Sequence, residues 1–183
     1  MPTGDQIDLK ALQDTVDAVR ANPELGRATF TVEGSWQGGF RAATHTGALT
    51  MGGERDESRV AKFQMSSDEP HAAMGTDTAP SPLEFVLHAL AGCYTVTLAI
   101  HAALMGIELE GFRLELEGDI DMRGPFGIDP EVRPGIQQLR VRVHLDAPRA
   151  DRKQLEELVS AVERYSAIRD TIANPVDVVT TLA

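Results

Sequence analysis

Residues 82–106, PLEFVLHALAGCYTVTLAIHAALMG, decide how this chain folds. The stretch carries one charged residue, Glu84, and at about 1.5 Å per residue a helix of this length could cross a bilayer. No Lys or Arg stands close to either end to anchor it, and His88 and His101 interrupt the apolar run. We therefore expect a helix buried nearly all round, in a large core or a subunit interface, and no membrane span.

A start signal precedes this helix. Ser81 is a favoured N-cap residue, Pro82 suits the first helical position, and Glu84 stands three residues after Ser81, which together make a capping box. Gly106 is expected to end the helix. We favour this structural role of Glu84 over a role as general base.

The sequence on either side predicts strands in groups, with helices apart from them. Before the long helix we expect a helix over residues 5–20 and strands over 28–33, 39–51 (with a turn near Thr46-Gly47) and 59–65. After it, strict alternation predicts two antiparallel strands around residues 112–117 and 138–145, then a helix capped by Asp151, a short helical piece at 167–172 and a strand at 176–182. This order predicts an α+β fold. No repeat or linker divides the chain, so we expect one domain over residues 1–183, with 1–22 as an N-terminal helical extension.

Composition excludes several functions. The 17 Lys and Arg against 28 Asp and Glu give a formal charge of −11, which disfavours nucleic acid and anionic membranes as partners. Cys93 is the only cysteine, so an intrachain disulfide and a Cys-based zinc site are excluded. The five histidines form no metal-binding pair, and nucleotide-binding motifs are absent, so we expect neither metal nor cofactor. The first residues, MPTGDQIDLK, do not resemble a signal peptide, and we expect a cytoplasmic protein.

Cys93 is the candidate nucleophile, and two interpretations of it stay open. Most free cysteines are small apolar groups in a packed core. A reactive thiol needs a nearby cation or hydrogen-bond donor and some access to solvent. The preceding Gly92 would let another element approach the sulfur closely.

Three segments of the chain resemble a known family. The run at 79–111, APSPLEFVLHALAGCYTVTLAIHAALMGIELEG, resembles the OsmC/organic hydroperoxide resistance family, whose members carry such an apolar helix with Ala-Gly-Cys inside it. RYSAIRDTIANPVDV, at 164–178, is similar to the second conserved region of that family. GDIDMRG, at 118–124, resembles one of its sub-branches.

The resemblance implies a fold and a chemistry. It implies an intertwined homodimer with two long central helices per chain, packed between antiparallel sheets, and sites at the subunit interface. Family enzymes reduce organic hydroperoxides through a cysteine that becomes a sulfenic acid, which a second cysteine resolves as a disulfide before an external dithiol reduces it. The attacking cysteine corresponds to Cys93.

The chain departs from the family at two site positions. Ser166 stands where the resolving cysteine is expected, so this is a divergent member that lacks it. The catalytic glutamate of the family would fall at Leu83, and Glu84 beside it is rotated by about 100° on a helix. The arginine that binds the thiolate corresponds best to Arg41, in WQGGFRAA, whose guanidinium would lower the pKa of the thiol.

Two functions follow from these residues. The first is a one-cysteine peroxidase, in which Cys93 and Arg41 are catalytic, Glu84 and Ser166 are site neighbours, and an external thiol completes the reduction of an organic hydroperoxide. The second is a homodimer without peroxidase chemistry that binds an apolar small molecule at its interface. A weaker third interpretation is a structural dimer with a vestigial site.

Overall fold

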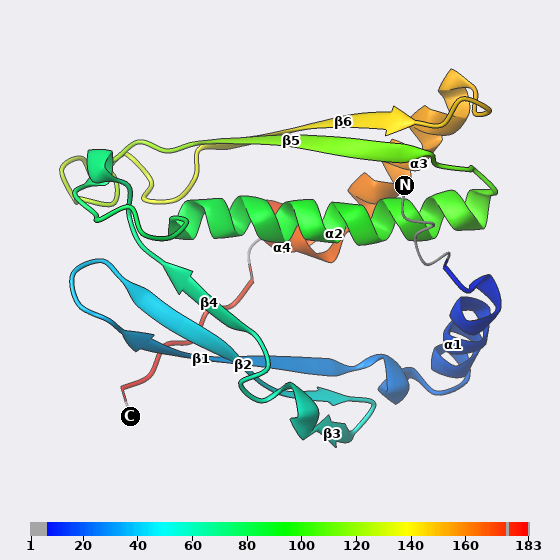
Figure 1. Cartoon of the computed structure of the whole chain (residues 1–183), viewed down its shortest axis with the longest axis horizontal. Coiled ribbons are helices and arrows are strands. Elements are labelled where there is room, and N and C mark those ends of the chain that lie inside the picture. The colour runs from blue at the N-terminus through cyan, green and yellow to red at the C-terminus, as the bar shows by residue number, and fades with distance from the viewer. Residues whose placement is uncertain (1–6, 175, 183) are drawn as a thin grey trace. The chain divides into compact units, whose positions relative to one another are not determined.

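The computed structural model describes residues 7–174 and 176–182, which form the expected α+β fold with antiparallel sheets (Figure 1). The chain divides into two compact units, residues 1–85 and residues 86–183. The boundary falls near the start of the long helix.

The first unit begins with helix α1 (Leu9–Ala21), close to the predicted span. The carboxylate of Asp8 caps its start by accepting a hydrogen bond of 3.0 Å from the Ala11 N–H. Asn22 ends the helix, and its side chain accepts from the Glu24 N–H in the 3₁₀ turn η1 (Pro23–Gly26) that follows.

One sheet makes up most of the first unit. Strand β1 (Ala28–Trp36) pairs with β2 (Ala42–Met51), and the other side of β2 pairs with β3 (Glu54–Asp56) and β4 (Gln64–Ser67). The turn expected near Thr46-Gly47 is wrong, because β2 runs straight through it. The register with β1 shifts there instead, between Phe30 and Val32, and the bare backbone of Gly47 faces Thr31 closely: a Cβ would lie 2.3 Å from its Oγ1.

The strand expected at 59–65 is also wrong in its first half. The 3₁₀ turn η2 (Glu57–Arg59), which the Asp56 carboxylate caps by accepting a 2.8 Å hydrogen bond from the Ser58 N–H, ends there, and residues 60–63 continue as an irregular turn. The strand β4 begins only at Gln64.

A loop over residues 68–80, which includes the 3₁₀ turn η3 (His71–Ala73), leads to the long helix and is organised by one buried carboxylate. Asp68 accepts hydrogen bonds from the hydroxyls of Thr76 and Thr78 and from the N–H groups of Glu69 and Thr78. The Thr76 hydroxyl is the largest cause that holds the pKa of Asp68 far below its usual value, and the other donors add to it against the opposing effect of burial. The loop therefore closes around an ionised side chain.

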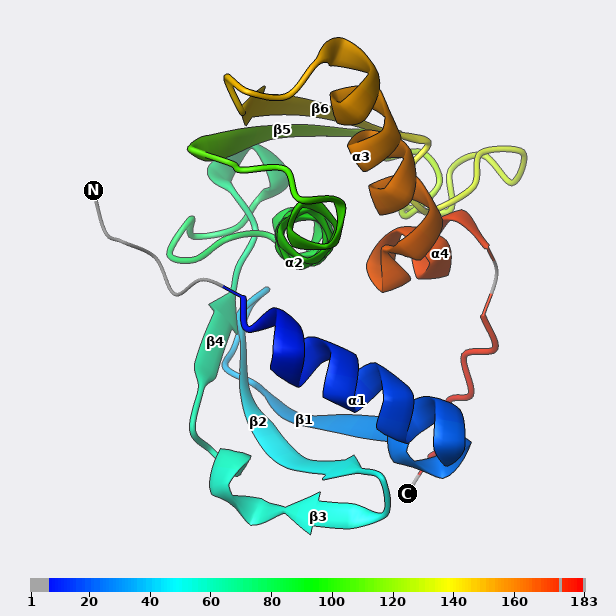
Figure 2. The same cartoon turned by 90° about the vertical axis from the view of Figure 1, so that its right-hand side faces the viewer.

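The long helix α2 (Pro82–Met105) supplies the core of the second unit. One face is buried, with Leu90, Tyr94, Leu98 and Ala102 four residues apart. This face packs against the sheet of β5 (Gly111–Asp119) and β6 (Gln138–Asp146) and against helix α3 (Arg152–Tyr165), which is followed by α4 (Ala167–Ala173). Figure 2 shows α2 end-on below β5 and β6, with α3 and α4 beside it.

Within the second unit α2 is buried on one side only, so its burial at a subunit interface stays a prediction. The sheet, α3 and α4 cover one side, whereas Val96 and Leu104 are 59% and 55% exposed. By length and composition alone, α2 is apolar enough to cross a membrane, as the core helix of a soluble protein can be.

The start of α2 matches the prediction: the Ser81 N–H donates to Glu84 Oε2 at 2.7 Å, and the Glu84 N–H donates to Ser81 Oγ at 3.3 Å. The capping box is thus confirmed.

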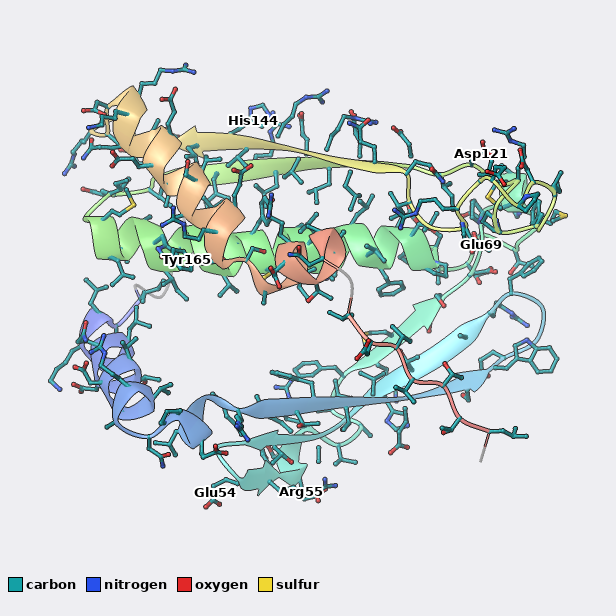
Figure 3. The ribbon with its side chains drawn as sticks, turned by 180° about the vertical axis from the view of Figure 1, so that it is seen from behind. Glu54, Arg55, Glu69, Asp121, His144 and Tyr165 are labelled. Carbon is teal, nitrogen blue, oxygen red and sulfur yellow. The ribbon has the colours of Figure 1, made fainter. Side chains whose placement is uncertain are left out.

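The two-stranded sheet has one apolar and one charged face, as its alternation predicts. Phe112, Leu114 and Leu116 pair with Leu145, Val143 and Val141 and pack toward the core. On the outer face, where His144 points away from α2 (Figure 3), opposite charges lie across the strands. We call this outer set the charge ladder; it comprises Arg113, Glu115, Glu117, Asp119, Arg140, Arg142 and His144.

The final strand expected at 176–182 is wrong. These residues have no regular secondary structure, and Val178 and Val179 are 83% and 84% exposed. A strand needs a neighbour for its backbone groups, and no strand in the described part of the chain pairs with this segment.

Candidate functional site

The candidate site centres on Cys93, in the middle of α2. Its side chain is half-buried, and the next residue, Tyr94, is buried. The Thr97 hydroxyl donates a 2.8 Å hydrogen bond to the Cys93 carbonyl oxygen one turn away. The sequence suggested that Gly92 lets another element approach the sulfur, but no described atom of another element lies within 4 Å of where a Cβ at position 92 would be.

The junction of α3 and α4 brings hydrogen-bond donors to the sulfur. Ser166, 1% exposed, ends α3 and caps α4, and its hydroxyl donates to Cys93 Sγ at 3.2 Å. The Ile168 N–H donates to the same sulfur at 3.5 Å. The Arg169 N–H in turn donates to Ser166 Oγ at 3.3 Å, which leaves the Ser166 hydrogen free to point at the sulfur.

These donors change the acidity of the thiol. Burial raises the pKa of Cys93, but hydrogen bonds from the Ile168 N–H, the Ser166 hydroxyl and the Ala167 N–H oppose it. Together the donors prevail, and the pKa lies below its ordinary value. In this unit the thiolate is therefore favoured by neutral donors, two of them N–H groups that the first turn of a helix leaves unpaired.

The sequence analysis placed Ser166 near Cys93 but missed the backbone donors. Ser166 followed by a short helical piece is an N-cap signal, and an N-cap implies free N–H groups immediately after it. That signal predicts the donors of Ala167 and Ile168 locally. It does not predict which distant side chain they face.

Arg41 lies in the first unit, in the turn between β1 and β2. Its Nη2 donates to the Gln37 carbonyl at 3.1 Å, and its backbone N–H donates to the Gly38 carbonyl at 3.2 Å. The arginine lines a pocket of about 350 Å³ together with the hydroxyl residues Ser66, Ser67 and Thr78. Arg41 and Cys93 belong to different units, so the pairing of this guanidinium with the thiolate stays a prediction.

Glu84 is also in the first unit, and its carboxylate is engaged at the start of α2 by the capping box. Leu83, at the position expected for the catalytic glutamate, is half-buried. The geometry gives Glu84 the helix-capping role that the sequence predicted, while its place as a neighbour of the site stays a prediction.

A second contact joins α2 to the same junction. The rings of His101 and Tyr165 stack with centroids 4.8 Å apart and planes 11° from parallel. Cys93, Thr97 and His101 follow one another at intervals of four on α2, so the end of α3 lies along one stripe of this helix. The sequence analysis did not identify this pair. Among the described residues, no group of three or more His, Cys, Asp or Glu side chains could hold a metal ion.

Comparisons with known proteins agree with this architecture. A family model described as OsmC-like protein matches residues 75–181, more than half of the chain. A search of curated proteins gave no match.

Solved structures share the fold at low sequence identity. An OsmC-like protein from Mycoplasma pneumoniae has a TM-score of 0.64 at 14% identity, over 80% of this chain and 89% of that chain. An organic hydroperoxide resistance protein from Legionella pneumophila has a TM-score of 0.57 at 18% identity, over 81% and 92%. For an organic hydroperoxide resistance protein from Bacillus subtilis the TM-score is 0.51 at 18% identity, over 81% and 93%.

Proposed function

Because the chain belongs to the OsmC-like protein family, we propose that it reduces organic hydroperoxides, with Cys93 as its single redox centre and an external thiol as its reductant. The observation that carries the proposal is the half-buried sulfur of Cys93 with the Ser166 hydroxyl and the Ile168 N–H donating to it. Two of the structures that share the fold are named as organic hydroperoxide resistance proteins.

The first half-reaction oxidises Cys93. Its thiolate attacks the outer oxygen of the hydroperoxide, an S–O bond forms, and the O–O bond breaks. The leaving alkoxide takes a proton from water and departs as an alcohol, and the sulfur becomes a sulfenic acid. The lowered pKa of Cys93 raises the fraction of thiolate available for this step.

The second half-reaction needs a thiol from outside. Ser166 occupies the position beside the sulfur where a resolving cysteine would stand, and an alcohol cannot form the disulfide. One external thiol condenses with the sulfenic acid, forms a mixed disulfide and releases water. A second thiol attacks that disulfide, leaves as part of an external disulfide and restores the Cys93 thiol.

Further parts of the proposal come from the family resemblance. Arg41 would add a positive charge near the thiolate, and Glu84 would lie at the edge of the site. We also propose an intertwined homodimer, which the exposed Val96 and Leu104 on the apolar α2 support. The proposed setting is cytoplasmic, without nucleic acid or membrane as a partner.

Stopped-flow kinetics with cumene hydroperoxide tests the activity. We expect single-turnover oxidation of Cys93 to be faster than oxidation of free cysteine at the same pH, and Cys93→Ser to abolish it. A rate constant no greater than that of free cysteine would contradict the proposal.

The alternative function is a homodimer that binds an apolar small molecule at its interface without peroxidase chemistry. The same exposed apolar side chains on α2 favour it. It predicts a Cys93 that is no more reactive than free cysteine, together with an apolar ligand retained in native mass spectra. The kinetic experiment therefore separates the two functions.

A further inference from the structure

A cavity of about 300 Å³ lies within the second unit, and Cys93 and the residues that donate to its sulfur do not line it. We call it the Tyr94 cavity. Its wall is mostly apolar and is contributed by α2, β6, α3 and α4; the apolar lining includes Leu90, Leu139, Val141, Val143, Val159 and Ile172. This size is at the small end of the range for ligand sites.

Three polar side chains line the Tyr94 cavity. Tyr94 is buried, and burial raises the pKa of its hydroxyl, which the nearby Arg169 guanidinium partly opposes. Glu163 is exposed, whereas Arg169 is half-buried. The positively charged Arg169 is therefore less exposed to solvent than the negatively charged Glu163.

The Arg169 guanidinium has no carboxylate partner. In the part of the chain that the structure describes, no acidic side chain lies within 4.0 Å of it, although Glu163 lines the same cavity. A charge taken partly out of water needs a counter-charge to offset its lost hydration. The N–H groups of the Arg169 guanidinium can therefore donate two parallel hydrogen bonds to the carboxylate of a ligand.

We propose that the Tyr94 cavity binds a small amphipathic carboxylate, with its carboxylate on the Arg169 guanidinium and its apolar tail against β6 and α3. The apolar lining selects a tail of hydrocarbon. Glu163 at the same cavity repels a second negative charge, so a singly charged carboxylate fits better than a phosphate. The site is separate from the sulfur and does not require the proposed peroxidase reaction.

Calorimetric titration with octanoate tests this site. We expect saturable binding to the intact protein, weakened at least about tenfold in Arg169→Gln, the loss expected for one charge-assisted interaction. Octan-1-ol, which has the tail without the charge, is expected to bind at least about tenfold more weakly than octanoate for the same reason. Inorganic phosphate, which has charge without a tail, should not bind.

Matched variants control the interpretation. Arg149→Gln removes an exposed arginine of the same unit that does not line the cavity, and it should bind octanoate like the unmodified protein. Arg169→Lys keeps the charge and should bind more tightly than Arg169→Gln, which separates lost charge from lost folding. Glu163→Gln should bind octanoate at least as tightly as the unmodified protein. Absence of octanoate binding, equal binding by Arg169→Gln, or equal binding of octanol overturns the proposal, whatever the peroxidase assay gives.

Discussion

The Ser166 hydroxyl donates a hydrogen bond to Cys93 Sγ across 3.2 Å, although the two residues lie 73 positions apart in the chain. The oxygen of Ser166 itself accepts the Arg169 N–H, so the direction of the hydroxyl is fixed by the start of α4. The thiol of α2 is thereby connected to the junction of α3 and α4.

Ser166→Ala should raise the pKa of Cys93, because it removes a donor that stabilises the thiolate. A hydrogen bond to a charged group corresponds to a rise of roughly one unit. The loss of the N-cap should also lower the free energy of unfolding by about 1 kcal/mol. The pH dependence of alkylation by iodoacetamide measures the first effect, with Ser160→Ala, on the exposed side of α3, as control. An unchanged alkylation profile in Ser166→Ala would show that the hydroxyl does not act on the thiolate.

Ser166→Cys should create a disulfide with Cys93 under mild oxidation. The side chains already meet, so a sulfur at position 166 needs only a small approach to reach the bond length of about 2.05 Å. Mass spectrometry of the unreduced protein should show the loss of two hydrogens. Ser160→Cys should keep two free thiols under the same treatment, and free thiols in both variants would contradict the observed geometry.

In acid, protonation of the Glu115 carboxylate should lower the free energy of unfolding. Hydrogen bonds from Arg113, and then from His144, are the largest causes that lower the pKa of Glu115 to about 2 from its usual 4.5. Since the folded value is depressed, the stabilisation is fully present above about pH 4.5 and is lost as the pH falls toward 2. Glu115→Gln should therefore flatten the dependence of Tm on pH in this window. If Tm of Glu115→Gln depends on pH as steeply as that of the unmodified protein, the loss of stability in acid arises from other groups.

Asp68→Asn should loosen the loop at 68–80. An amide cannot accept as many strong hydrogen bonds as the carboxylate that Thr76, Thr78 and the Glu69 N–H now share. Hydrogen exchange of the loop amides should become faster than in Asp77→Asn, an exposed control in the same loop. Equal exchange in both variants would argue that the loop does not depend on this carboxylate.

Local signals predicted the parts of this fold that depend on neighbours in sequence. The capping box of Ser81 and Glu84, the long α2 and the alternation of β5 are such features, and the predicted family is confirmed as well. The turn predicted near Gly47 was wrong because glycine is common both in turns that end a strand and in β-bulges within a strand, and here it belongs to a bulge.

Features that depend on distant partners could not be predicted in this way. Alternating valines suggested a strand at 176–182, but a strand forms only where a second one supplies its hydrogen bonds. For the same reason the sequence did not identify the Ile168 N–H as a donor to Cys93, because the N-cap signal of Ser166 predicts a free N–H there but not the distant side chain that it faces. The residue Ser166 was found through the family pattern rather than through its spacing.

The charge ladder has an effect beyond holding β5 to β6. Its three arginines and three acidic side chains cancel when His144 is neutral, within a chain whose formal charge is −11. The surplus of acidic groups is therefore carried by other surfaces of the molecule. Any long-range attraction between this protein and a positively charged partner has to originate there, because the outer side of this strand pair is electrically balanced.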